Sequence, residues 1–136
     1  MKTLISAGLG VVVAVALGSP APGTAARAAA AAADTTFPPG VIALGDSIFH
    51  GRVGGGLCFA CHGPNAKGTP GLAPDLTDNQ WLHGDGSYAF IVKTVTTGVP
   101  KPKQAAAPML PKGGATLTPE QVQAVAAYVY SLRHAT

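Results

Sequence analysis

The sequence predicts a small all-α domain of roughly three to five short helices, because apolar residues recur with a helical period in three separate segments. These segments are 41–49, 88–97 and 118–133, and residues typical of helix ends flank each of them. The stretches between them are rich in glycine and proline, which indicates loops. With 136 residues, the chain has the length of a single domain.

The first helix is expected to begin near Pro38 and Pro39, since proline is tolerated in a first turn. A glycine inside a helix lowers its stability relative to alanine. Gly45 therefore predicts the close approach of another helix backbone, and the alternative is a weak helix with an incidental glycine. The apolar face of this helix consists of Val41, Leu44, Gly45, Ile48 and Phe49.

The pentapeptide Cys58-Phe59-Ala60-Cys61-His62 reads C-x-x-C-H, the attachment motif of a c-type haem. On one helical turn, the two thiols can each add across a vinyl group of the same porphyrin. The imidazole that follows is then held close to the iron, where it can serve as an axial ligand. Cys58 and Cys61 are the only two cysteines, so the motif predicts one covalently bound haem.

Other interpretations of the motif are open at this point. A structural zinc site needs four N or S ligands, and the sequence has neither a second C-x-x-C nor an H-x-x-x-H. A thioredoxin-like redox pair would need a βαβ context, which is not seen, and a plain disulfide is a further alternative. An ordinary surface role for His62 is disfavoured by its position directly after Cys61.

The middle helix is predicted over 88–97, between N-cap residues at 85–87 and a C-cap glycine, Gly98. Its β-branched content would also suit a strand, but the cap signals agree with the helical period. Just before it, residues 78–83 are expected to form one turn that buries Trp81. The apolar face of the helix consists of Tyr88, Ile91, Val92 and Val95.

The last helix has the clearest start signal, because Thr118, Pro119 and Gln121 form a T-x-x-Q capping box with proline in the first turn. Tyr128 lies beside the apolar stripe and is expected to pack on Phe49 or near Gly45. The stripe consists of Val122, Val125, Ala126, Val129 and Leu132.

The proline-rich loop 99–116 contains Met109, the only methionine besides Met1. A lone methionine is commonly a core gap-filler. Met109, however, lies in Pro108-Met109-Leu110-Pro111 within a loop rather than on an amphipathic helix. This position favours a thioether ligand to haem iron. The alternative sixth ligands are His50, His83 and His134.

Residues 1–33 have the pattern of a signal peptide followed by an alanine-rich lead-in. A lysine at position 2 precedes an uncharged apolar run, 4–17, and then Gly, Pro and Ala residues. The run is short for a membrane span, which takes about 20 residues, and retention as an N-terminal anchor is the alternative. Export by a Sec-type signal and the haem motif together predict a bacterial periplasmic protein. Residues 34–40 are then a flexible linker and 41–134 the folded domain.

Composition argues against several function classes. From Thr35 onward, seven Lys and Arg residues and five Asp and Glu residues give a net charge of +2. No basic run with interleaved aromatic residues is present, so no nucleic-acid partner is expected. The absence of G-x-S-x-G and of a credible carboxylate pair indicates no small-molecule substrate. A mature chain of about 100 residues is small for a self-sufficient core, so a buried haem is expected to be part of the fold.

Taken together, these residues resemble the class I c-type cytochromes over roughly 41–132. Gly45 and Phe49 are similar to the family's N-terminal helix motif, and 128–132 is similar to the end of its C-terminal helix. The resemblance implies a cytochrome c fold in which these two helices cross beside one haem c, with Met109 as the second axial ligand. It further implies that the Pro74 carbonyl orients His62, and Trp81 is a further candidate for contact with the haem.

The resemblance implies a single-electron carrier rather than an enzyme, a monomer that shuttles electrons between membrane or periplasmic redox proteins. The alternative is a cytochrome subunit of a larger dehydrogenase or oxidase complex. A further alternative is a gas-binding or peroxidatic haem protein with an open sixth position, which carbon monoxide binding would reveal.

Overall fold

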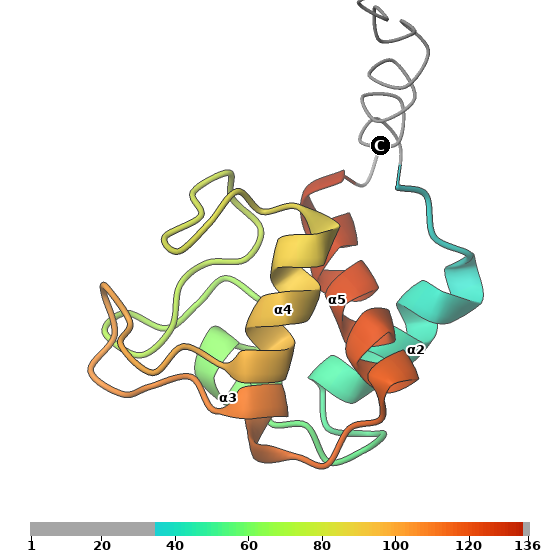
Figure 1. Ribbon diagram of the computed structural model, residues 1–136, viewed down its shortest axis with the longest axis horizontal. Coiled ribbons are helices and arrows are strands. Elements are labelled where there is room, and N and C mark those ends of the chain that lie inside the picture. The colour runs from blue at the N-terminus through green and yellow to red at the C-terminus, as the bar shows by residue number, and fades with distance from the viewer. Residues whose placement is uncertain (1–34, 135–136) are drawn as a thin grey trace, which may run out of the picture. The chain divides into compact units, whose positions relative to one another are not determined.

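The computed structural model describes residues 35–134, which form four α-helices and one short 3-10 helix. The helices are α2 (Pro39–Phe49), α3 (Cys58–His62), α4 (Tyr88–Thr97), η1 (Pro111–Gly114) and α5 (Pro119–His134), shown in Figure 1. In this part of the chain, β-structure is limited to two isolated bridges, Thr69 with Ala73 and Val99 with Met109. The predicted all-α class is confirmed.

The N-terminal predictions fall largely outside this description. The predicted signal peptide, residues 1–33, and its alternative as an anchor lie outside the described residues. Among residues 35–134, no helix is both long and apolar enough to cross a membrane. Of the predicted linker, residues 39–40 form the start of α2, and the ring of Phe37 packs 4.7 Å from the ring of Tyr88, measured between centroids.

The first and last helices cross, and α4 runs beside α5 (Figure 1). At the crossing, a Cβ on Gly45 would overlap the carbonyl oxygen of Ala124 and lie 2.6 Å from the Cβ of Tyr128. The predicted close approach is therefore confirmed, and glycine is needed because backbone atoms cannot rotate away. Next to this point the ring centroids of Phe49 and Tyr128 are 5.4 Å apart, as the sequence predicted.

Gly45→Ala is expected to lower the free energy of unfolding by about 1–3 kcal/mol, because the added methyl group forces α2 and α5 apart. The matched control is Gly40→Ala in the first turn of α2, where an added Cβ meets nothing within 4 Å. That control should be neutral or gain up to about 1 kcal/mol from helix propensity. Urea denaturation followed by far-UV circular dichroism measures both, and equal effects would contradict the crossing as the cause.

Side-chain caps define the predicted starts of α4 and α5, and a backbone hydrogen bond closes the end of α4. The Ser87 hydroxyl accepts a hydrogen bond from Phe90 N (3.2 Å), and Gly98 N donates to Thr94 O at the other end of α4 (2.8 Å). At the start of α5, the Thr118 hydroxyl accepts from Gln121 N (3.3 Å), and the Gln121 amide oxygen accepts from Thr118 N (2.9 Å). This reciprocal pair is the predicted capping box.

Two segments differ from the prediction. Residues 78–83 form bends rather than a helical turn, and the Asp78 carboxylate accepts from Gln80 N (2.9 Å). This local bond offers the backbone an alternative to a helical turn, and Trp81 is only half-buried. The 3-10 helix η1 was not predicted; in it Lys112 has φ +56°, and its ammonium donates to Leu117 O (2.8 Å).

Candidate functional site

A cavity of about 340 Å³ lies between α3, α4 and the loops that precede and follow α4. Phe49 of α2 and Val125 and Val129 of α5 contribute apolar wall from the core side. Met109 joins the C-x-x-C-H turn in the same lining although it is far away in the sequence. All six predicted site residues line this cavity: Cys58, Cys61, His62, Pro74, Trp81 and Met109.

His62 is the last residue of α3 and is only 8% exposed. Its ring nitrogen Nδ1 lies 3.0 Å from the Pro74 carbonyl oxygen. A carbonyl can only accept, so the proton is assigned to Nδ1 and the lone pair to Nε2. Burial lowers the pKa of His62, and the bond to Pro74 partly opposes this. The ring is therefore favoured in its neutral form, the form that binds metals through Nε2.

The two cysteines are free thiols on the single turn of α3, Cys58 half-buried and Cys61 exposed. Burial raises the pKa of the Cys58 thiol, which keeps it protonated. Next to it lies the chain that follows Met109, because a Cβ on Gly113 would come within 3.3 Å of Cys58 Sγ. The loop that carries Met109 thus returns to the attachment turn.

The backbone of Met109 both donates a hydrogen bond to the backbone of Val99 and accepts one from it. Among the rival sixth ligands, only His83 also lines the cavity, and its Nε2 lies 3.3 Å from the backbone nitrogen of Lys103. His134 instead stacks on Tyr130, with ring centroids 4.0 Å apart. His50 is bonded to backbone carbonyls outside the cavity lining.

Two buried hydrogen-bond donors lie close together next to the cavity. Within residues 35–134, neither Trp81 Nε1 nor Arg133 Nε has an acceptor. The Arg133 guanidinium lies 4.9 Å from the centroid of the Trp81 ring, which itself lines the cavity. Arg133 is not part of the cavity lining, and its guanidinium places a positive charge next to the Trp81 ring. The thiols, the neutral imidazole, the thioether and the apolar walls of the cavity fit a haem.

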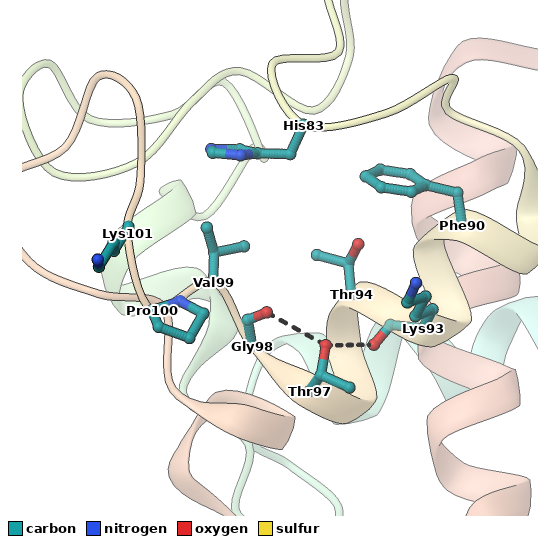
Figure 2. A pocket seen from close by; sticks show the side chains of 9 residues that line it. All are labelled: His83, Phe90, Lys93, Thr94, Thr97, Gly98, Val99, Pro100 and Lys101. Atoms are coloured by element: carbon teal, nitrogen blue, oxygen red, sulfur yellow. Dashed lines mark hydrogen bonds between the residues drawn. The ribbon is translucent and has the colours of Figure 1, made fainter.

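A second, more open hollow of about 450 Å³ lies between His83, Phe90 and the C-terminal end of α4 (Figure 2). The hydroxyl oxygen of Thr97 lies 3.0 Å from Lys93 O and 3.3 Å from Gly98 O, as Figure 2 shows. Neither cysteine nor His62 lines this hollow. The Thr97 hydroxyl is bonded to the backbone and Lys93 and Lys101 are exposed, so we assign no function to this hollow.

His50 bonds through both ring nitrogens to backbone carbonyls. Nδ1 lies 2.9 Å from Asp46 O and Nε2 lies 2.9 Å from Pro64 O, just past the haem-binding motif. Carbonyls only accept, so both bonds require a proton on each nitrogen, that is, the imidazolium. The Pro64 carbonyl is the main cause of a raised pKa for His50, and Asp46 adds to it while burial and Arg52 oppose it.

We therefore expect His50 to stabilise the fold more at acidic than at alkaline pH. A raised folded pKa gives stability that is present below the unfolded value of about 6.5 and is lost as pH rises through the folded value. His50→Gln should accordingly reduce the free energy of unfolding more at pH 5.5 than at pH 8.5. Asp46→Asn should leave most of this difference, because Pro64 is the larger cause. If His50→Gln lowered the free energy of unfolding equally at both pH values, His50 would not be a charged imidazolium that makes both hydrogen bonds.

An all-α domain with a C-x-x-C-H turn and a methionine lining one apolar cavity defines a class, the c-type haem proteins. The sequence model of the cytochrome c family matches residues 42–133, and the chain belongs to this family. A solved structure, cytochrome cL from Methylophaga aminisulfidivorans, matches with a TM-score of 0.56 and 19% identity over 88% of this chain and 71% of that one. At that identity the match supports the fold alone.

Relatives include subunits of cbb3-type cytochrome c oxidases. The chain is 40% identical over 94 residues to subunit CcoP from Rubrivivax gelatinosus, which covers 69% of this chain and 27% of CcoP. It is 42% identical over 76 residues to subunit FixP from Bradyrhizobium sp. strain ORS 278, covering 55% of this chain and 23% of FixP. The chain thus spans about a quarter of the length of these relatives.

Family membership makes the domain an electron-transfer module with covalently bound haem c, as the sequence predicted. The expectation of a free, monomeric carrier has no support in these comparisons, because the relatives are named as oxidase subunits. The alternative of a cytochrome subunit in a larger complex fits them better.

Sequence reasoning missed two features of the site. It identified Gly98 as a helix cap but not its contact with the Met109 backbone, and it gave no sign that Arg133 lies over the Trp81 ring. Both contacts join residues on different elements, so no local pattern signals them.

Proposed function

We propose that this chain supplies a single-haem cytochrome c domain to a terminal oxidase complex of the cbb3 type and passes electrons to it one at a time. The observation that carries the proposal is the 40% identity over 94 residues with CcoP. Because the match takes in 27% of CcoP, the proposal concerns the cytochrome domain and not the other functions of that subunit.

Haem c, when bound, supplies the one-electron ferric–ferrous couple. Cys58 and Cys61 hold it through two thioether bonds. His62 binds the iron through Nε2, and its Nδ1–H bond to the Pro74 carbonyl fixes the orientation of the ring.

In the same proposal, Met109 would be the second ligand of the iron, through its sulfur, because it lines the same cavity as His62. Held by both His62 and Met109, the haem would supply electron transfer rather than the binding of small ligands. Trp81 would contact the haem from the cavity wall. The apolar walls from Phe49, Val125 and Val129 keep water away from the ring.

The proposal also covers location and domain limits. We place the cytochrome domain at residues 39–134, from the start of α2 rather than from the predicted residue 41, and outside the cytoplasm, with residues 1–33 as the export signal. Their charged start, apolar run and alanine-rich end support this assignment. The intact mass of the exported protein would show both whether the signal is removed and whether one haem is attached.

The test is electron exchange with a purified cbb3-type oxidase. When the reduced protein is mixed with oxidised oxidase in a stopped-flow instrument, it should be reoxidised in a single phase. In a second experiment, a tagged chain should co-purify with oxidase subunits from detergent-solubilised membranes. Lys101→Glu with Lys103→Glu, two exposed changes outside the core, controls for charge steering and should alter the rate mainly at low salt. A monomer that neither co-purifies nor exchanges electrons with the oxidase would instead favour the free carrier.

A further inference from the structure

Met109 is attached to the end of α4 by its backbone. Val99 N donates to Met109 O (2.9 Å), and Met109 N donates to Val99 O (3.1 Å). This pair of hydrogen bonds holds together the two ends of the loop 100–108. Two further bonds hold the outer part of the loop, Ala106 N to Gly71 O (3.0 Å) and Lys103 N to His83 Nε2 (3.3 Å).

Gly98, the residue before the bridge, is in direct contact with the Met109 backbone. It is buried, has φ +68°, and its N–H donates to Thr94 O (2.8 Å), which closes α4. A Cβ at this position would overlap the carbonyl oxygen of Met109 and lie 2.8 Å from Pro111 N. Both are backbone atoms, so no side-chain rotation could relieve the overlap.

We propose that Gly98 is a positioning residue for Met109: because it lacks a side chain, the Met109 backbone rests against the end of α4, and this contact places the thioether in the haem cavity. The inference rests on the proposed function, in which Met109 binds the iron. The support behind this contact is rigid, because Ile91 and Val95 of α4 are buried in the core.

Position matters here because the thioether is a weak ligand. Sites of this kind need their ligands within about 0.5 Å of the productive position. Any side chain at residue 98 forces the Met109 backbone, the end of α4, or both to move. The nearby prolines, Pro108 and Pro111, limit how far the loop can adjust to bring the sulfur back.

The test compares Gly98→Ala with Gly55→Ala in the haem-loaded protein. Gly55 has φ +70°, nearly the same as Gly98, but a Cβ there meets nothing within 4 Å. Both variants therefore put alanine at a positive φ, and only Gly98→Ala pushes on the Met109 backbone. Gly98 also has ψ −170°, a combination nearly confined to glycine, so the thermal midpoint is measured beside the haem readouts. The readouts are the near-infrared sulfur-to-iron band of the ferric protein, the reduction potential and carbon monoxide binding to the ferrous protein.

Gly98→Ala should lose the sulfur-to-iron band, bind carbon monoxide and have a lowered potential, as Met109→Ala should. Gly55→Ala should keep all three wild-type properties even if its thermal midpoint falls. Gly98→Asn repeats the test at the same contact with a second side chain.

Two results would overturn the positioning role. One is a wild-type band and no carbon monoxide binding in folded Gly98→Ala and Gly98→Asn. The other is failure of both to yield holoprotein while Gly55→Ala matures normally, which would assign Gly98 to folding alone. If Met109→Ala itself keeps the wild-type spectrum, the ligand assignment in the proposed function fails, and the role of Gly98 fails with it.

Discussion

Replacing Cys58 and Cys61 together by alanine is expected to abolish the exported holoprotein. They are the only cysteines, so no other residue can form the thioether bonds. Without haem, the apolar cavity of about 340 Å³ loses its filling. A domain of about 100 residues has little spare core to offset that loss. Intact mass, together with visible absorption of the denatured protein, measures the outcome: wild type should carry one covalent haem and the double variant none.

Single substitutions sharpen this test. Cys58→Ala and Cys61→Ala should each retain one attachment and yield much less holoprotein than wild type. Ala60→Ser is the matched control, because this exposed residue lies on the same turn, lines the same cavity and carries no thiol. A wild-type mass equal to the bare polypeptide, from cells able to mature cytochromes c, would contradict covalent attachment.

Features set by neighbouring residues were predicted well from the sequence. The capping box at Thr118 and the Ser87 cap involve residues within one turn of each other, so their side-chain types identify them. The C-x-x-C-H motif is equally local. The contact of Gly45 with α5 joins distant residues, yet it was also predicted. Glycine inside a helix lowers the stability of the helix, and a close contact with another helix explains why it is there.

Contacts between elements distant in sequence were not predictable in the same way. The Gly98 contact with Met109 joins a helix end to the far side of a loop, and glycine at a C-cap already has a sufficient local explanation. The second bond of His50, to Pro64, depends on how the chain folds back after α3. Lys112 has a positive φ, which lysine rarely adopts, and its ammonium donates to Leu117 O, five residues further along the chain.

Met109→Ala is expected to produce the largest functional change that leaves the haem attached. Thioether sulfur is a soft ligand that stabilises ferrous over ferric iron, so its loss should lower the reduction potential. A fall on the order of 0.1 V or more is expected, within the range of about 0.8 V that axial ligands span. The ferric sulfur-to-iron band should disappear, and the ferrous protein should bind carbon monoxide at neutral pH.

Met109→His distinguishes the effect of changing the ligand from the effect of losing it. It should also lower the potential, yet keep the iron six-coordinate and closed to carbon monoxide. The structure narrows the competing assignments, because among His50, His83 and His134 only His83 lines the cavity with Met109. If Met109→Ala kept the wild-type spectrum and potential, His83 would be the ligand to test next. His83→Ala should then produce the loss of six-coordination that we expect from Met109→Ala.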